Sequence, residues 1–326
     1  MDKHKAREHI KILSIGAAVQ DVFLQGKLFT PKREHNHSVE EFQLGSKNDI
    51  EAVTFSTGGG ATNAAVTFAR QGMHSLFMGK IGQDLPGRAI IDDLHKELVD
   101  TSLVEKVKDF ATGYSCLLLA PSGERTILTY RGASAHMEFG LKDFHDVEAD
   151  WLFLTSMAGN FEALKDVFSY AENKNINIAM IPGKDELSQA HKFKSFLPKV
   201  KILVANKEEL AMLYGGNTLE ELVRAANKDV HYVVGTDGPK GAVAADRWHI
   251  VKAGMYEDVP VIDRSGAGDA FASGFIAMIA CGETLEQAVT FASANSTSVV
   301  GQIGAKAGIL HRHAKIHDMP LIVSEL

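Results

Sequence analysis

Residues 263–276 read DRSGAGDAFASGFI, and this stretch indicates how the rest of the chain folds and functions. Four small residues, from Ser265 to Gly268, precede an apolar segment that runs to Ala280 with helical spacing. Small residues let the backbone approach a ligand closely, while the free N–H groups and the dipole at a helix start favour an anion. The stretch therefore predicts a phosphate site at the beginning of a helix.

Asp269 stands directly behind these small residues, where a carboxylate would repel bound phosphate. Phosphoryl transfer nevertheless uses an acid at such a place, as the base that accepts the proton of an incoming hydroxyl. The structural alternative is an acidic residue that only stabilises the helix through its dipole. For Asp269 taken alone, both interpretations stay open.

A second cluster of small residues, TGGGATNAA at 57–65, also begins a helical pattern. Its three glycines expose backbone amides, and Asn63 in the first turn offers a donor and acceptors to the hydroxyls of a ligand. A tight loop with a helix cap would have the same sequence. The cluster therefore predicts either a hydroxyl-binding turn or a plain loop before a helix.

Around these clusters, short β-type runs alternate with amphipathic helical runs, which predicts an α/β fold with a mostly parallel sheet covered by helices. The expected strands are 12–16, 75–79, 151–155, 176–180, 201–205 and 231–234. The expected helices are 61–71, 87–98, 161–172, 219–226 and 267–280.

Two stretches interrupt the alternation. Residues 22–57 are polar and mixed, and residues 113–131 read as a hairpin with Pro121, Ser122 and Gly123 in its turn. We expect parts of both stretches to form a small separate sheet that acts as a lid over one edge of the main sheet.

Composition excludes several classes of protein. The 326 residues include 34 Lys and Arg against 41 Asp and Glu, a net charge of −7, with no long basic block, so a nucleic-acid partner is not expected. No run of 18 apolar residues and no apolar signal core is present, so we expect a cytoplasmic protein without a membrane partner. Cys116 and Cys281 lie in apolar stretches and are expected as buried free thiols.

The common nucleotide-binding motifs are also missing. The chain has no GxxxxGK[ST] sequence, and Gly16 after the first expected strand is followed by AAVQD instead of a GxGxxG pattern. These differences exclude a P-loop enzyme and a dinucleotide-binding Rossmann fold.

The two glycine clusters together resemble the two signatures of the ribokinase-like (PfkB) carbohydrate kinases. Residues 59–65, Gly72 and Gly82 match the amino-terminal signature, and residues 263–269 with 273–276 match the carboxy-terminal one. The signatures are long and occur in the family's order. Arg264 departs from the family, which usually has a small hydroxyl or branched residue there.

This resemblance implies one kinase domain over residues 1–326, made of the α/β body and a small β lid. It implies transfer of the γ-phosphoryl group of ATP to a hydroxymethyl group. Asp269 is then the general base, and the amides of Gly266, Ala267 and Gly268 form an anion hole for the transferring charge. Lids in this family often pair between two chains, so a homodimer through the lid is also expected.

The resemblance also implies where the acceptor binds. Asp21 is similar to the acid that grips sugar hydroxyls, and Gly59, Gly60 and Asn63 line the same pocket. A carboxylate suits this role because it accepts two hydroxyl hydrogen bonds at a fixed spacing.

The nucleotide and the metal ions are assigned in the same way. Asn206 and Glu209 resemble the N-x-x-E element that holds the hydration shell of Mg²⁺ and phosphate, although a helix cap is the alternative. Residues 235–241, with Thr236, Gly238 and Gly241, resemble the loop over the nucleotide phosphates and ribose, and residues 293–304 fall where the family builds its adenine pocket.

Asp263 resembles the acid of a monovalent-cation site, which adds K⁺ to ATP and Mg²⁺ as a possible cofactor. An aspartate that caps its own turn is the alternative at this position.

The acceptor is open between a sugar and a nucleoside. True ribokinases usually have a Lys in the glycine cluster and a Glu after the strand at 151–155, where this chain has Ala61 or Thr62 and Ser156-Met157. Adenosine kinases usually have a longer lid and GGS in place of GGG.

Four apolar residues of the lid region, Phe23, Leu24, Phe29 and Phe42, could sandwich a base, which keeps a nucleoside kinase as the alternative. A catalytically silent sugar- or nucleotide-binding relative is a second alternative, and only Arg264 supports it.

Five histidines raise the question of a metal site, but none falls in a metal-binding spacing. We therefore expect His35, His37, His311, His313 and His317 to be surface residues.

Overall fold

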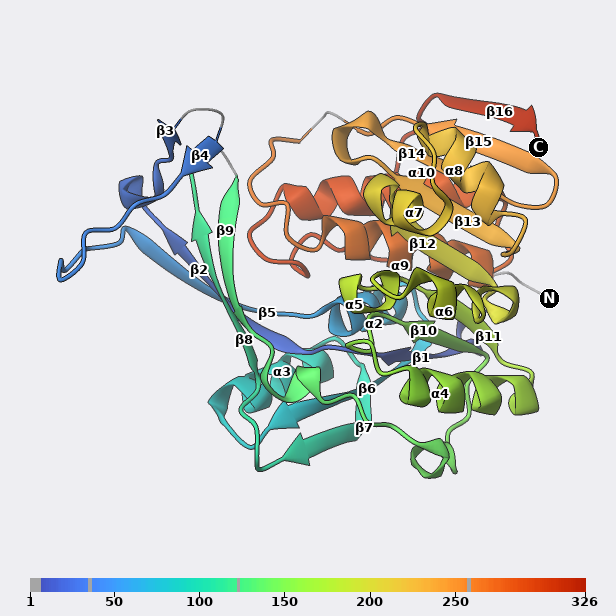
Figure 1. Ribbon diagram of the computed structural model, residues 1–326, viewed down its shortest axis with the longest axis horizontal. Helices are drawn as coiled ribbons and strands as arrows, with labels where there is room; N and C mark the ends of the chain where they lie inside the picture. Colours follow the sequence, from blue (N-terminus) through green and yellow to red (C-terminus); the bar gives the residue numbers. More distant parts are fainter. Residues whose placement is uncertain (1–6, 35–36, 122–123, 257–258) are drawn as a thin grey trace.

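The computed structural model describes residues 7–34, 37–121, 124–256 and 259–326. They form a large central sheet with helices on both faces and a smaller sheet at one side (Figure 1). The α/β class predicted from the alternating pattern is confirmed.

The central sheet has ten strands in the order β16-β15-β14-β13-β12-β11-β10-β1-β6-β7. Their bounds are β16 (Leu321–Glu325), β15 (His249–Ala253), β14 (Ala242–Ala245), β13 (Tyr232–Thr236), β12 (Ile202–Asn206), β11 (Asn177–Met180), β10 (Trp151–Leu154), β1 (Lys11–Ile15), β6 (His74–Gly82) and β7 (Asp100–Val107). The strands from β7 to β13 run parallel, whereas β14, β15 and β16 pair antiparallel at the opposite edge. All six strands expected from the sequence lie in the parallel part, and the sequence pattern missed β7 and the three antiparallel strands.

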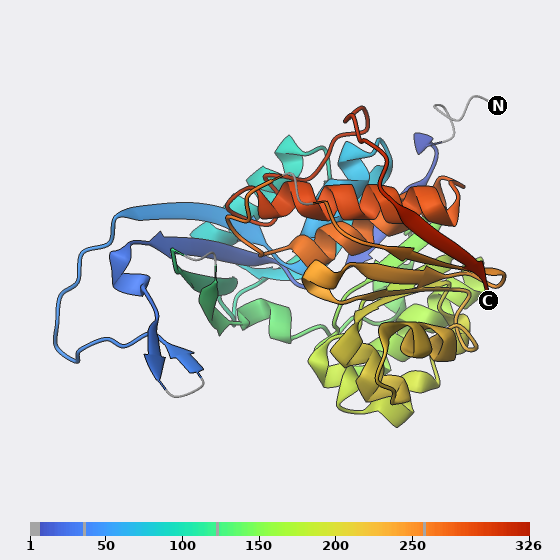
Figure 2. The same cartoon turned by 90° about the horizontal axis from the view of Figure 1, so that it is seen from above.

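Helices cover the two faces of this sheet as separate layers (Figure 2). One layer consists of α2 (Gly60–Arg70), α3 (Leu85–Lys96), α9 (Ala267–Ala280) and α10 (Leu285–Val300). The other consists of α4 (Phe161–Lys174), α5 (Lys184–Leu187), α6 (Ala190–Lys194), α7 (Lys207–Tyr214) and α8 (Leu219–Ala226). Successive residues of a strand point to opposite faces, so Ile12 of β1 packs in the first layer and Leu13 in the second.

Of the five expected helices, α8 and α9 have the predicted ends, and the ends of α2, α3 and α4 differ by at most two residues. The short helices α5 and α6 and the long helix α10 were not expected. For α10 the reason is its composition, since Ser293, Asn295 and Thr297 are buried polar residues of this helix. Their small or hydrogen-bonded side chains conceal the apolar periodicity that sequence analysis depends on.

The smaller sheet has four strands in the order β5-β2-β8-β9, with bounds β5 (Ala52–Gly58), β2 (Val19–Gln25), β8 (Gly113–Leu119) and β9 (Arg125–Tyr130). A separate two-stranded sheet joins β3 (Lys32–Glu34) and β4 (His37–Val39). The expected hairpin is present as β8 and β9, although Ser122 and Gly123 of its turn lie outside the described residues. The four-stranded sheet also begins three residues earlier than expected, at Val19.

The topology brings the expected functional residues to one edge of the central sheet. Parallel strands end at the same edge, and loops at that edge form the ligand sites of open α/β sheets. Asp21 follows β1, Asn206 ends β12 and Thr236 ends β13. Residues far apart in the sequence therefore meet there.

A buried carboxylate fixes the loop after β10 at this edge. Glu186 of α5 is fully buried and accepts hydrogen bonds from the N–H groups of Met157, Gly159 and Gly183 and from Ser156 Oγ, each at 2.9 Å. One side chain thus supplies the acceptor for four buried or partly buried donors.

Glu186→Ala is expected to lower the free energy of unfolding by about 3 to 5 kcal/mol, because these donors lose their acceptor. Glu172 is the control, since it is 63% exposed and its carboxylate pairs with Lys199 at the surface, and Glu172→Ala should cost less than about 1 kcal/mol. Urea unfolding of both variants measures the difference, and similar losses in the two would contradict the role of Glu186.

Candidate active site

The beginning of α9 forms the first part of the site. Gly266 precedes the helix with a φ of 75°, and a side chain there would collide with Ala305. The first N–H groups of a helix have no acceptor within it, and the N–H of Ala267 makes only a long bond of 3.4 Å to the carbonyl of Arg264. The helix start that the sequence predicted is confirmed, while anion binding by its amides stays a prediction.

Asp269 lies in the first turn of α9 and contacts α2. Asn63 Nδ2 donates a hydrogen bond of 2.8 Å to Asp269 Oδ2, which orients the carboxylate. Burial raises the pKa of Asp269, and the hydrogen bond from Asn63 opposes this rise. A carboxylate with a raised pKa is a stronger base for a hydroxyl proton.

The glycine turn between β5 and α2 separates two carboxylates. A side chain at Gly58 would collide with the carboxylate of Asp21, and a Cβ at Gly60 would lie 3.1 Å from Asp269 Oδ1. Gly59 between them has a φ of 100°, which favours glycine. The three glycines therefore form a floor with Asp21 at one end and Asp269 at the other.

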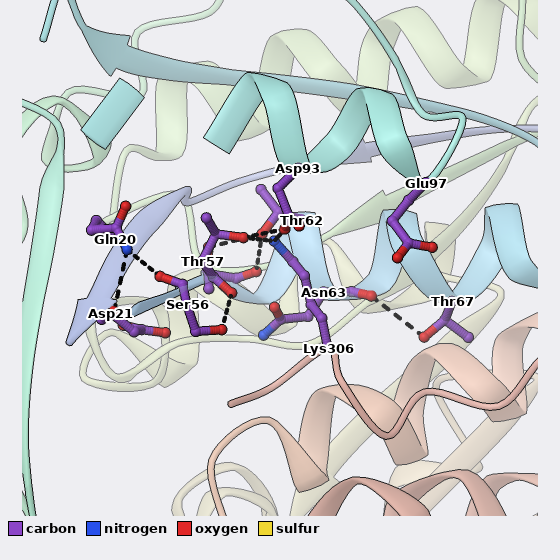
Figure 3. A network of polar contacts seen from close by, with 12 residues as sticks. Gln20, Asp21, Ser56, Thr57, Thr62, Asn63, Thr67, Asp93, Glu97 and Lys306 are labelled. Atoms are coloured by element: carbon purple, nitrogen blue, oxygen red, sulfur yellow. Dashed lines mark hydrogen bonds and ion pairs between the residues drawn. The ribbon is translucent and has the colours of Figure 1, made fainter. Parts of the chain in front are cut away.

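Asp21 lies in β2, with Ser56 of β5 and Ser115 of β8 as its neighbours across the small sheet. Its side chain is buried, and burial raises the pKa of Asp21 to about 6. A hydrogen bond with Ser115 and the attraction of Lys306 act in the opposite direction. Figure 3 shows Asp21 and Asn63 within one network of polar residues on the β5 and α2 side of the site.

A pocket on the other side of the α9 start is formed by three separate parts of the chain. Its lining residues are Thr236, Gly238, Pro239, Gly241, Gly254, Met255, Val261, Arg264, Ala267, Gly268, Phe271, Ser293, Ser296, Thr297 and Val300. The structure thus brings together the expected phosphate loop and the expected adenine segment, which lie more than fifty residues apart. The mixture of small, apolar and hydroxyl-bearing residues suits a flat ring with a few polar atoms.

Asn206 and Glu209 cap the start of α7. Asn206 Oδ1 accepts from the N–H of Glu209 at 2.9 Å, and Glu209 Oε2 accepts from the N–H of Asn206 at 2.8 Å. Burial raises the pKa of Glu209, against the backbone hydrogen bond from Asn206. Neither residue lines the pocket described above, so the helix-cap interpretation accounts for their contacts.

Asp263 is fully buried in the loop before α9. Its Oδ1 accepts from the N–H of Ser265 at 2.9 Å, and its Oδ2 accepts from the N–H of Gly304 at 3.0 Å. The guanidinium of Arg125, from β9, lies 4.0 Å from Oδ1. These contacts order the loop before α9 and match the turn-capping alternative, while a K⁺ site remains a prediction.

Arg264, the departure from the family pattern, has a partner in the small sheet. Its guanidinium lies 3.9 Å from the carboxylate of Glu124, beside the contact between Arg125 and Asp263. The two pairs have opposite polarity, so the end of the β8–β9 hairpin and the loop before α9 attract each other at two points. Sequence analysis did not identify Arg125, because nothing local in a hairpin indicates a contact 138 residues away.

Several buried polar atoms around the site have no hydrogen-bond partner among the described residues. They are Asn63 Oδ1, Arg125 Nε, Ser265 Oγ and Ser293 Oγ. A buried polar atom without a partner costs free energy, and such atoms are rare in folded proteins. These four atoms lie on both sides of the α9 start, where polar groups of a ligand would satisfy them.

The four apolar residues considered as a base sandwich do not lie together. Phe23 is fully buried, whereas Leu24 follows it in β2 and points to the opposite face of the sheet. Phe29 packs edge-on against Phe42 at 6.2 Å between ring centroids. Phe23 and Leu24 therefore cannot contact the same base, but the contact between Phe29 and Phe42 leaves the choice between a sugar and a nucleoside open.

The remaining expectations concern histidines, cysteines and the membrane. His311, His313 and His317 are exposed, His35 lies outside the described residues, and no side-chain position is described for His37. Within the described part of the chain, no helix is long and apolar enough to cross a membrane. Cys116 and Cys281 are free thiols, although both are partly exposed instead of fully buried.

Comparison with known proteins gives a family and a fold. The model of the pfkB family carbohydrate kinases matches residues 31–312. The chain is 26% identical to a ribokinase of Bacillus subtilis over 261 residues. The aligned region covers 78% of this chain and 85% of that protein. Two solved structures have the same fold, a ribokinase of Arabidopsis thaliana complexed with ribose and ATP (TM-score 0.71, 20% identity, 93% and 96% of the two chains) and an adenosine kinase of Sinorhizobium meliloti (TM-score 0.72, 21% identity, 91% and 95%).

Asp21→Asn is expected to stabilise the protein at pH 8 but not at pH 4. The pKa of Asp21 is about 6 in the folded protein, above its ordinary value of 3.8, so the folded state binds this proton more tightly and stability falls as pH rises through that interval. An amide removes the penalty, which amounts to at most about 3 kcal/mol. Thermal unfolding at both pH values measures it, and a larger loss of stability at pH 8 than at pH 4 would contradict it.

Proposed function

We propose an acceptor and a mechanism for this chain, which belongs to the pfkB family of carbohydrate kinases. The proposed reaction transfers the γ-phosphoryl group of ATP to a hydroxymethyl group of a small sugar. The observation that supports it is the glycine turn at 58–60, with Asp21 at one end and Asp269 at the other, beside the start of α9.

In this proposal Asp21 binds and orients the sugar. Its carboxylate accepts hydrogen bonds from two sugar hydroxyls, and Asn63 Oδ1, which has no partner among the described residues, accepts from another hydroxyl. Holding the sugar at fixed points brings its hydroxymethyl oxygen in line with the phosphorus. The small sheet that carries Asp21 covers the sugar and excludes water, which would otherwise accept the phosphoryl group.

Asp269 accepts the proton of the hydroxymethyl group as the oxygen attacks. Its Oδ2 is held by Asn63, so Oδ1, which faces Gly60, is the oxygen that we assign to the proton transfer. The amides of Gly266, Ala267 and Gly268 then donate to the negative charge that develops on the transferring group.

The pocket beside α9 fits ATP, because it offers small residues for the phosphates and ribose and a mixed surface for the adenine ring. We assign the phosphates and ribose to Thr236, Gly238 and Gly241, and the adenine ring to the segment 293–304. ATP supplies the transferred group, and Mg²⁺ neutralises its phosphates. Glu209, together with Asn206, would hold Mg²⁺ through water, which agrees with the preference of this ion for a hydration shell.

A sugar is favoured over a nucleoside because the curated relatives include ribokinases from several organisms at about one quarter identity. A nucleoside kinase remains the alternative, since its fold is the same. A silent relative is less well supported, because Asp269 and the start of α9 are intact and Arg264 pairs with Glu124.

Three earlier expectations belong to this proposal. The outer face of the small sheet exposes Phe55, Leu128 and Tyr130, which suits a homodimer through the lid, and sedimentation tests it.

Slower hydrogen exchange in β2 and β8 with bound sugar tests lid closure. Equal rates in K⁺ and in a large inert cation would exclude a K⁺ requirement at Asp263. The cytoplasmic location stays a prediction.

The experiment that tests the function is an assay of ATP consumption with a panel of pentoses, hexoses and nucleosides. We expect turnover with a sugar and at least tenfold lower kcat/KM with nucleosides, because kcat/KM measures discrimination between acceptors. Turnover with nucleosides alone would favour the alternative acceptor, and no turnover at all would favour the silent relative.

Asp269→Asn and Asp21→Ala are expected to act on different parameters. Asp269→Asn should reduce kcat by about 10² to 10⁴ with both KM values within about tenfold, because a positioned base contributes that much. Asp21→Ala should raise the sugar KM by about 10² with the ATP KM little changed, since hydrogen bonds to a charged group contribute about 1.5 to 3 kcal/mol each. Steady-state kinetics separates the two, and an Asp269→Asn variant with more than about a tenth of the wild-type rate would place the base elsewhere.

A further inference from the structure

Lys306 is a buried cation that the sequence did not single out. It lies in the loop after α10 and is only 6% exposed. Its ammonium donates to Thr57 Oγ1 at 2.6 Å and pairs with Asp93 Oδ2 of α3 at 3.3 Å (Figure 3). Lysines are almost never fully buried unless they are paired, so this position is costly and calls for a specific reason.

The main chain at Lys306 is fixed as firmly as its side chain. Arg70 of α2 donates from Nη1 to the carbonyl of Lys306 at 3.0 Å and to that of Ile309 at 2.6 Å. Arg70 is itself held by Glu97, directly after α3, through two hydrogen bonds of 2.6 and 2.8 Å. The ammonium therefore extends from a rigid support.

The loop that carries Lys306 connects the two halves of the site. On the α9 side, the N–H of Gly304 donates to Asp263, and Ala305 lies against Gly266, where a side chain would not fit. On the β5 side, the ammonium of Lys306 holds Thr57, the residue directly before the glycine turn. A short loop thus fixes the turn at 58–60 relative to the start of α9.

Lys306 also contributes charge to the pocket that contains Asp21. The groups that act on Asp21 are the hydroxyl of Ser115, the ammonium of Lys306 and the carboxylates of Asp263 and Asp269. Burial, and to a smaller extent the two carboxylates, raise the pKa of Asp21, while Ser115 and Lys306 lower it. Lys306 is the one cation among the groups that act on Asp21 in the described chain.

We propose that Lys306 is a positioning residue of the acceptor site, which holds the glycine turn through Thr57 and balances the negative charge of Asp21. The inference rests on the proposed function, because it concerns the sugar that Asp21 binds. Lys306 acts through Thr57 and Asp21, since Thr57 and Asp93 occupy its ammonium.

The test compares Lys306→Met with Lys80→Met. Lys80 is buried to a similar degree, since its side chain is 9% exposed and that of Lys306 is 7% exposed. Lys80 pairs with Glu105 and Glu138, outside the proposed site. Both variants should lose thermal stability. Lys306→Met alone should raise the sugar KM by about tenfold at pH 7, with the ATP KM changed less than threefold, because the change affects only the acceptor side.

A pH profile separates positioning from simple stability. Without the cation the pKa of Asp21 rises. As the pH is lowered, the sugar KM of Lys306→Met should therefore begin to increase at a pH about one unit higher than that of the wild type and of Lys80→Met. Thr57→Val provides a second variant that keeps the charge and removes the hydroxyl. It should raise the sugar KM severalfold without moving the pH profile, and it keeps the test decisive if Lys306→Met does not fold.

The outcomes distinguish the two proposals. If the wild type is active and Lys306→Met has the same sugar KM and pH profile, the role of Lys306 is overturned and the kinase assignment stays intact. An unchanged sugar KM in Thr57→Val would have the same consequence. Equal increases of the sugar and ATP KM values in Lys306→Met and Lys80→Met would also overturn it. A wild-type protein that phosphorylates neither a sugar nor a nucleoside would overturn both proposals.

Discussion

Two carboxylates at the ends of one short glycine turn are the constraint on which this site depends. Burial raises the pKa of both Asp21 and Asp269, and the nearby carboxylates of Asp263 and Asp269 raise the pKa of Asp21 further. Groups from different elements stabilise these carboxylates, since Asn63 donates to Asp269, Ser115 forms a hydrogen bond with Asp21, and the charge of Lys306 attracts Asp21. The relative positions of β2, α2, β8 and the loop after α10 therefore determine the surroundings of both carboxylates.

The glycines themselves connect the sequence to this electrostatic problem. Gly58 and Gly60 lack the side chains that would collide with or crowd the two carboxylates, and Gly59 adopts a conformation that favours glycine. Gly266 has the same function at the start of α9, where it allows the loop of Ala305 to approach. Close approach of backbones, more than flexibility, therefore explains why glycines occur at both ends of the site.

The sequence could predict the parts of the site whose chemistry is local. The helix start at 265–269 and the glycine cluster at 57–65 are contiguous, and Asp21 followed from the resemblance to a kinase family. Lys306 and Arg125 could not be predicted, since their partners lie 249 and 138 residues away and neither stands in a motif. The antiparallel strands β14 to β16 and helix α10 were missed for a related reason, because tertiary packing decides the structure of short strands and of a helix with buried polar residues.

Arg264 illustrates how a departure from a family pattern can be understood from its partners. At the sequence level it was the one feature that favoured a silent relative. In the structure the loop residues Asp263 and Arg264 face Arg125 and Glu124 of the β8–β9 hairpin with reversed charges. The Arg264–Glu124 pair is exposed and contributes little stability, whereas Asp263 of the other pair is fully buried. Together the two pairs link the small sheet, which carries Asp21, to the loop before α9, so a shift of this sheet would change the contacts of that loop.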